Sequence, residues 1–198
     1  MLKIGITGNI GGGKTTVSKI FEMLEIPVFY ADDAAKKVMV EDIILIDAIK
    51  SAFGNEAYFS DGSLNRKHIA SIVFNNESEL VNLNTIVHPA VFRAFDTWVA
   101  QIKNAPYVMK EAALLFESTS YKMCDYSIMV TAPLELRIER VLKRDGLTRA
   151  EIESRNAKQF SEEKKTQLAD FVVRNDDTEL VIPQVIELHK QFLALAAK

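Results

Sequence analysis

The chain has 198 residues, of which 48% are hydrophobic, and a formal net charge of −3 at pH 7. This length supports one domain with a full core and room for a small inserted subdomain. The weak charge, without long blocks of one sign, disfavours a nucleic-acid binder, and no apolar run approaches the ~20 residues of a membrane span. Met1-Leu2-Lys3 leads straight into a strand pattern rather than a secretory signal, and Cys124 is the single cysteine. We therefore expect no membrane or nucleic-acid partner, no internal disulfide and a reducing, cytoplasmic location.

Short apolar strand patterns alternate with longer helical patterns along the chain. The strands are predicted at residues 2–7, 27–30, 107–109, 125–131 and 171–174. Their apolar character predicts burial on both faces, as in a parallel sheet covered by helices. We therefore expect an α/β fold with three layers, α/β/α, around a five-stranded parallel sheet.

The first helix is predicted to begin near Lys14. Val17, Ile20, Phe21 and Leu24 have the i, i+3, i+4, i+7 spacing of a single apolar stripe. The chain thus opens as strand, glycine-rich turn, helix and strand. A closing helix is predicted from about residue 178.

Residues 34–105 form a mostly helical pattern with a turn at 60–63. A segment of this length exceeds the ~10–12 residues of a minimal crossover between parallel strands. We expect a helical insertion that covers the carboxyl edge of the sheet, where ligands of such folds bind.

The clearest motif lies between the first strand and the first helix and reads Gly8-Asn9-Ile10-Gly11-Gly12-Gly13-Lys14-Thr15, a full match to G-x-x-x-x-G-K-[ST]. Glycines permit the dihedrals that turn backbone N–H groups toward a phosphate, and the following helix adds the positive end of its dipole. Lys14 is predicted to reach the β- and γ-phosphates of ATP, and the Thr15 hydroxyl to ligate Mg²⁺. Thr16 is expected near the α-phosphate. The motif and its context predict a P-loop NTPase-type fold.

Asp32 follows the second strand within Tyr30-Ala31-Asp32-Asp33. A carboxylate at that strand end would sit beside the phosphate loop in a parallel sheet. A kinase needs such a group to orient an acceptor hydroxyl and to take its proton. The alternative is that Asp32 or Asp33 caps a helix beginning at Ala34. Both interpretations stay open, because capping by one aspartate does not exclude catalysis by the other.

Five of the eight arginines lie between residues 137 and 155. Arg137, Arg140 and Arg144 share one face of a predicted helix that ends at Gly146. A kinase must surround the transferring phosphoryl group with cations and exclude water, which suits a lid at about residues 137–168. The alternative is a solvated face whose interleaved glutamates pair at i, i+4. The phosphate loop favours the lid.

Together these pieces resemble the dephospho-CoA kinase family over nearly the whole chain. The opening resembles the family's G-G-I-G-S-G-K-S, Ala31-Asp32 its D-A-D, Val87-His88-Pro89 its H-P, and Leu114-Leu115-Phe116-Glu117 its P-L-L-F-E. Arg140 and Arg144-Asp145 match a lid sequence Q-x-x-R-x-x-x-R-D, and Gln159, Ala169-Asp170-Phe171 and Asn175 match the closing Q…A-D-F…N.

The chain departs from the family pattern at several positions. Tyr30 replaces the first aspartate of D-A-D, Ala113 replaces the proline of P-L-L-F-E, and Arg137 replaces the lid glutamine. The acidic group after the third strand, commonly aspartate in the family, is Glu111 here. These departures concern neighbouring contacts rather than the reaction.

The resemblance implies a nucleotide core, a CoA-binding helical insertion and a lid. It implies ATP and Mg²⁺ as cofactors and dephospho-CoA as the acceptor, phosphorylated on its 3′-hydroxyl in the last step of coenzyme A synthesis. The residues implied are Lys14, Asp32 and Arg140 for catalysis, Gly8, Gly11, Gly12, Gly13, Lys14, Thr15, Thr16, Arg144 and Asn175 for the nucleotide, Thr15 for the metal, and Asp32, His88 and Glu117 for the acceptor.

Other interpretations accompany these assignments. His88 could be structural, Glu117 could cap a helix or pair with a lid arginine, and Asn175 could be a turn residue. A switch GTPase is disfavoured, because the chain contains neither N-K-x-D nor D-x-x-G. The remaining rivals are a nucleoside or nucleotide kinase and an ATP-dependent regulatory module. A monomer or weak homo-oligomer is expected.

Overall fold

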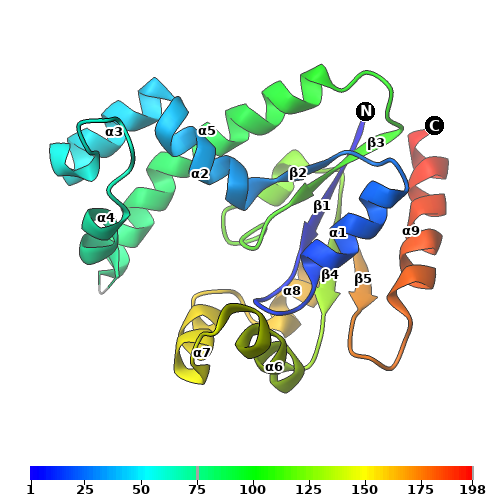
Figure 1. The fold of residues 1–198 in the computed structure, drawn as a ribbon. Coiled ribbons are helices and arrows are strands. Elements are labelled where there is room, and N and C mark those ends of the chain that lie inside the picture. The colour runs from blue at the N-terminus through cyan, green and yellow to red at the C-terminus, as the bar shows by residue number, and fades with distance from the viewer. Residues whose placement is uncertain (75, 198) are drawn as a thin grey trace. The chain divides into compact units, whose positions relative to one another are not determined.

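The computed structural model describes residues 1–74 and 76–197 (Figure 1). In chain order, the elements are β1 (Leu2–Thr7), α1 (Lys14–Met23), β2 (Val28–Tyr30), α2 (Ala31–Glu41), α3 (Ile43–Phe53), η1 (Asn55–Ala57), α4 (Arg66–Val73), α5 (Glu77–Gln101), β3 (Tyr107–Glu111), η2 (Ser120–Met123), β4 (Tyr126–Thr131), α6 (Leu134–Asp145), α7 (Arg149–Ala157), α8 (Glu162–Leu168), β5 (Phe171–Arg174) and α9 (Val181–Ala196).

The described strands form one parallel sheet in the order β2-β3-β1-β4-β5. The predicted α/β fold with a five-stranded parallel sheet is confirmed. Strand β3 runs two residues beyond its predicted end, to Glu111, which pairs in register with Ile6 of β1 and with Tyr30 of β2. The extension matters for the site, because it brings a carboxylate to the carboxyl edge of the sheet.

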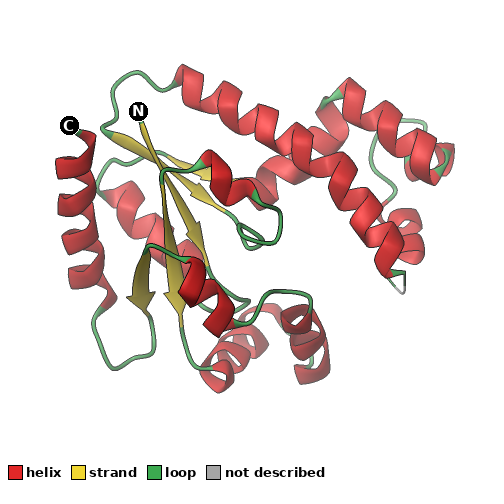
Figure 2. Ribbon diagram, turned by 180° about the vertical axis from the view of Figure 1, so that it is seen from behind, coloured by secondary structure: helices red, strands yellow, loops and turns green. Residues whose placement is uncertain are grey.

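Helices cover both faces of this sheet, as the reverse view in Figure 2 shows. On one face, α1 packs over β1 and α9 packs over β3 and β5, and Ile4, Ile6, Phe21 and Phe192 are fully buried there. On the other face lie α8 and the segment after β3, where a Cβ atom at Gly5 would meet the Leu115 side chain 2.8 Å away. Successive residues of β1 therefore face two different sides of the sheet, each packed against apolar side chains.

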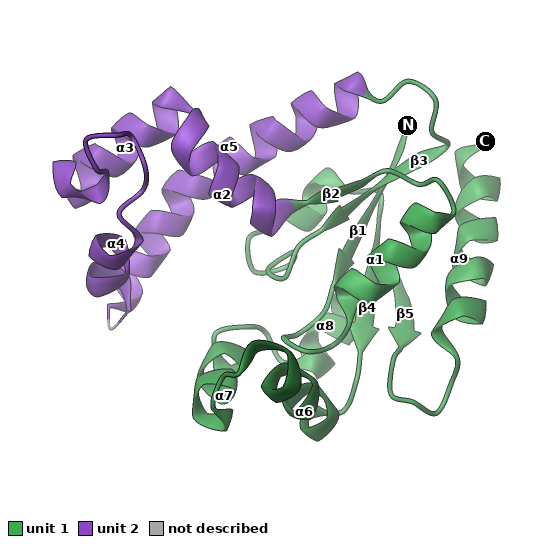
Figure 3. Cartoon of the chain, in the orientation of Figure 1, with its two compact units in different colours: residues 1–30, 102–198 green, residues 31–101 purple. Residues whose placement is uncertain are grey.

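The chain divides into two compact units, residues 1–30 with 102–198, and residues 31–101 (Figure 3). The second unit comprises α2 to α5 with η1, and its core includes Leu45, Ile49, Phe53 and Phe95. Trp98 stacks on Phe95, with ring centroids 6.2 Å apart. The unit therefore has an apolar core of its own.

Two helix boundaries differ from the sequence prediction. Helix α2 begins at Ala31 rather than Ala34, so Asp32 and Asp33 lie inside its first turn instead of preceding it. Carboxylates in a first turn interact favourably with the positive helix end, which explains the earlier start. Helix α9 begins at Val181 rather than near residue 178, because Thr178 donates to Asp176 in a local turn.

Within the described residues, no helix combines the length and apolarity needed to cross a membrane.

His189 gives the core a pH-dependent contact. Its Nδ1 atom lies 2.6 Å from the hydroxyl oxygen of the buried Tyr107. Burial lowers the pKa of the His189 imidazole from its usual value of 6.5, so folding favours the neutral ring.

The folded protein therefore binds this proton less readily than the unfolded chain does. The contribution of His189 to stability is complete above the unfolded pKa and is lost as the pH falls below about 6.5. We expect His189→Asn to lose less stability than the wild type between about pH 7.5 and about pH 5.5, the range in which histidine titrates. Urea unfolding at both pH values measures this, and equal losses would contradict the assignment.

Candidate active site

The phosphate loop connects the end of β1 to the start of α1 at the carboxyl edge of the sheet. Gly11 and Gly13 have φ values of 77° and 94°, in the region that favours glycine. Gly13 immediately precedes α1 and has no side chain to cap it. The first-turn N–H groups of the helix are thus left for a ligand, which is the arrangement that binds anions.

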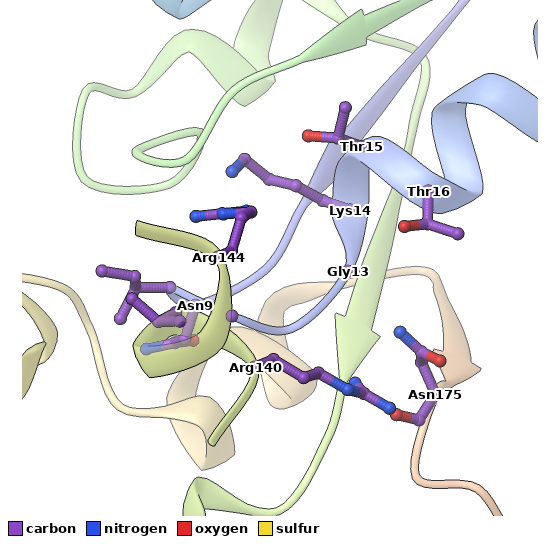
Figure 4. A pocket seen from close by; sticks show the side chains of 11 residues that line it. Asn9, Gly13, Lys14, Thr15, Thr16, Arg140, Arg144 and Asn175 are labelled. Atoms are coloured by element: carbon purple, nitrogen blue, oxygen red, sulfur yellow. The ribbon is translucent and has the colours of Figure 1, made fainter. Parts of the chain in front are cut away.

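A pocket of about 360 Å³ opens over this loop (Figure 4). Its size lies within the range of small-molecule sites. Its lining is formed by Asn9, Ile10, Gly11, Gly13, Lys14, Thr15, Thr16, Arg140, Val141, Arg144 and Asn175. The structure therefore brings together most of the residues that the sequence predicted for the nucleotide, from three separate parts of the chain.

Lys14 and Thr15, at the start of α1, both meet the carboxylate of Glu111. The Thr15 hydroxyl donates to Glu111 Oε1 over 3.1 Å, and Lys14 Nζ lies 3.8 Å from the same oxygen. Glu111 is only 6% exposed, at the end of β3. The hydroxyl of Thr15 and the ammonium group of Lys14, two residues that line the pocket, thus share one buried carboxylate behind them.

Arg140 links helix α6 to the loop after β5. It donates to the backbone oxygen of Asn175 over 2.9 Å and to Asp177 Oδ1 over 3.1 Å. The Asn175 amide in turn donates to the backbone oxygen of Gly12 over 3.0 Å. In Figure 4, Arg140 extends toward Asn175. Helix α6, the loop after β5 and the phosphate loop are therefore joined through Asn175.

Arg144 lies one turn further along α6 and pairs with its neighbour Asp145 over 2.7 and 2.8 Å. Gly146 ends the helix with φ 65°, as the sequence predicted. The Arg144 side chain is largely exposed and that of Asp145 is partly exposed, so water screens the attraction between them. The guanidinium of Arg144 is thus available to a stronger anion in the pocket.

Arg137 does not share the exposed face that the helical spacing predicted for it. It is 4% exposed and donates to Ala132, Ile10 and Asn156. The carboxylate of Glu162, whose Oε2 lies 3.3 Å from Arg137 Nε, is a fourth partner, and together these groups compensate the desolvation of the guanidinium. The predicted arginine face therefore retains Arg140 and Arg144 only.

Glu117 pairs with a lysine of α8 rather than with a lid arginine. Its Oε1 atom lies 3.0 Å from Lys165 Nζ and accepts from the backbone N–H of Phe160 over 2.7 Å. Lys165 is fully buried and also donates to the backbone oxygen of Ala113. Burial lowers the pKa of Lys165, and the Glu117 carboxylate opposes this shift. Nothing in the sequence indicated that Lys165 is buried, since lysines are common on exposed helices.

Asp32 and His88 belong to the second unit. Asp32 is exposed in the first turn of α2, and the His88 ring stacks on Phe92 within α5, with centroids 6.2 Å apart. Their roles remain predictions from the sequence.

A parallel sheet with this strand order, a glycine-rich phosphate loop between β1 and α1, and arginines on α6 above that loop define a P-loop kinase. The sequence profile of the family described as dephospho-CoA kinase matches residues 2–180. The chain belongs to this ATP-using kinase family.

Individual relatives agree with the family match. A curated dephospho-CoA kinase from Bacteroides fragilis is 37% identical over 187 residues, which cover 94% of this chain and 91% of that protein. A crystal structure from Thermus thermophilus superposes with a TM-score of 0.82 at 33% identity and covers 98% of this chain and 96% of its own. The structure of dephospho-CoA kinase from Campylobacter jejuni has a TM-score of 0.70, covering 97% of both chains, and at 24% identity it supports the fold.

Proposed function

We propose that this enzyme transfers the γ-phosphoryl group of MgATP to the 3′-hydroxyl of dephospho-CoA, giving CoA and ADP. The observation that carries the proposal is the complete phosphate loop with Arg140 and Arg144 over it, in a chain whose family match spans residues 2–180. Family membership supplies the acceptor, and the pocket supplies the means of holding the nucleotide.

The nucleotide phosphates are proposed to bind on residues 8–16, where the N-terminus of α1 and Lys14 attract negative charge. Arg140 and Arg144 are proposed to stabilise the charge that develops on the transferring group. Asn175, which already holds the Gly12 backbone, is proposed to contact the nucleotide from the loop after β5.

Asp32 is proposed as the base that orients the acceptor hydroxyl and accepts its proton. It lies two residues after Tyr30, which is in register with Glu111 in the sheet. His88 and Glu117 are proposed to contact the acceptor. One oxygen of Glu117 supports this, because Oε2 is buried without a hydrogen-bond partner among the described residues.

The residues at Thr15 fit a magnesium ion. Thr15 is exposed and lines the pocket, and its hydroxyl donates to the Glu111 carboxylate; oxygen donors of this kind suit a hard cation. When bound, Mg²⁺ would neutralise charge on the β- and γ-phosphates. Thr15 would be the protein ligand and Glu111 would orient it.

Glu111→Gln should therefore raise the Mg²⁺ concentration needed for half-maximal activity by about tenfold, the usual effect of losing a group that orients a metal ligand. The glutamine keeps the shape of the side chain but removes its charge. Titrating Mg²⁺ at saturating ATP measures the effect. An unchanged Mg²⁺ dependence would mean that Glu111 does not act on the metal.

We further propose a cytoplasmic monomer or weak homo-oligomer without a nucleic-acid partner. The single thiol offers no internal disulfide partner, and burial raises the pKa of Cys124 to about 11, so the thiol stays protonated at neutral pH.

The test is ADP release from MgATP with dephospho-CoA, compared with adenosine, AMP, dCMP and shikimate as acceptors. Release with dephospho-CoA alone, giving a product phosphorylated on the 3′-hydroxyl, is expected. Release with another acceptor would keep the kinase and replace its substrate. ATP binding without any acceptor-dependent release would favour a regulatory module.

A further inference from the structure

The residues Asn9 and Ile10, at the tip of the phosphate loop, are held by side chains far away in the sequence. The N–H of Ile10 donates to Gln159 Oε1 over 2.9 Å. The carbonyl oxygen of Ile10 accepts from Arg137 over 3.3 Å. Both polar groups of this residue are therefore fixed from outside the loop, one by each of two side chains.

Asn9 is held by the same region of the chain. Its amide group donates to the backbone oxygen of Phe160 over 3.0 Å and approaches Asn156 Oδ1 at 3.5 Å. Asn156 Oδ1 also accepts from Arg137 over 2.8 Å. Arg137 thus reaches the loop tip directly through Ile10 and indirectly through Asn156.

The backbone of α6 itself lies against the loop. A Cβ atom at Gly11 would collide with the backbone oxygen of Arg137. Next to this contact, Ile10 packs against the small apolar cluster of Ile138, Val141 and Ile152. The first turn of α6 therefore touches the loop through its backbone and its side chains.

Arg137 is anchored independently of the loop. Its Nε atom donates to the backbone oxygen of Ala132 over 2.9 Å and lies 3.3 Å from Glu162 Oε2. Glu162 Oε1 is itself held by the Thr131 hydroxyl over 2.8 Å. A guanidinium group bound on both edges of its plane has one orientation, so its contact with Ile10 is set by β4 and α8.

We propose that Arg137 is a positioning residue that, together with Gln159, fixes the Ile10 peptide and so presets the phosphate loop for the nucleotide. The inference rests on the proposed function. Glutamine, which the resemblance implies for the family at this position, has a shorter side chain and fewer donors than the planar fork of arginine. It would not reach all four acceptors, so arginine adds a constraint on the phosphate loop that glutamine would lack.

The test is the dissociation constant for ATP, measured by calorimetry without any acceptor. We expect Arg137→Gln to weaken ATP binding by about tenfold, as for the loss of hydrogen bonds from a charged group. The KM for the acceptor should stay unchanged. Arg137→Lys keeps the charge but not the fork, and we expect it to bind ATP as weakly as Arg137→Gln does.

Two further variants separate the loop effect from general destabilisation. Arg149→Gln is the matched control, because Arg149 lies in α7, pairs with Glu135 and Glu153, and makes neither of these loop contacts. It should bind ATP as the wild type does. Gln159→Ala removes the partner of the Ile10 N–H and leaves Arg137 in place, so it should also weaken ATP binding, even if an Arg137 variant fails to fold.

Several results would overturn the inference. An Arg137→Gln protein with a lower melting temperature but wild-type ATP affinity would leave Arg137 a purely structural role. Wild-type ATP affinity in Arg137→Lys would show that the positive charge alone, and not the planar fork, is needed. Wild-type ATP affinity in Gln159→Ala would show that the hydrogen bond to the Ile10 N–H does not affect nucleotide binding. Failure of the proposed function would be visible separately, as absence of CoA formation by the wild-type enzyme.

Discussion

Turnover of the Lys14→Met enzyme should fall by about 10²–10³-fold, the cost of removing one preorganised charge from a developing anion. Lys14 is part of the first turn of α1, lines the pocket and lies 3.8 Å from Glu111. Methionine keeps a similar length and flexibility but no charge. Because the attraction is strongest when charge accumulates on the transferring group, kcat should fall more than ATP affinity does.

Lys19→Met provides the control for this variant. Lys19 lies on the same helix, is exposed and is not among the pocket residues. Single-turnover rates and ATP dissociation constants should be compared for the three proteins. A Lys14→Met enzyme with wild-type kcat and merely weaker ATP binding would show that Lys14 holds the ground state only.

Asp32→Asn should lower kcat by about 10²–10⁴-fold, the usual contribution of a general base, while ATP still binds with its normal affinity. The substitution preserves the shape of the side chain and its place in the first turn of α2, but asparagine cannot accept the hydroxyl proton. Stability should change little, since Asp32 is exposed.

The adjacent Asp33 offers a matched comparison. It is also exposed in the first turn of α2, and its carboxylate pairs with Lys36 over 2.7 Å. Asp33→Asn should keep normal turnover, which separates a specific base from the general effect of negative charge at the helix end. Near-normal turnover in Asp32→Asn would remove Asp32 from the mechanism.

The fold could be predicted from the sequence because the signals that define its elements are local. The buried strands, the glycine-rich turn and the apolar stripe of α1 all lie within short windows, and the resemblance fixed the family. The residues of the nucleotide pocket followed from the same motifs. Helix ends were less certain, since Asp32 and Asp33 suit both a cap and a first turn.

Contacts between distant residues were beyond the reach of these patterns. Arg137 meets Ile10 across 127 positions, and no periodicity on α6 distinguishes a buried arginine from an exposed one. Its replacement of the family glutamine was the one available signal. The buried pair of Lys165 with Glu117 had no comparable mark, because only the tertiary fold shows which lysine loses its water.

The strand order also determines when the nucleotide-binding unit can fold during synthesis. β1 lies between β3 and β4, and β2 pairs with β3, so neither early strand has a partner until Tyr107 and the residues after it emerge. At the usual elongation rate, about a hundred intervening residues correspond to roughly 5–20 s of translation. Throughout that time the apolar strand from Leu2 to Thr7 is outside the ribosome or in its tunnel without a sheet to join. The early strands therefore stay without their hydrogen-bonding partners during this interval, and unpaired apolar strands of this kind are prone to aggregate.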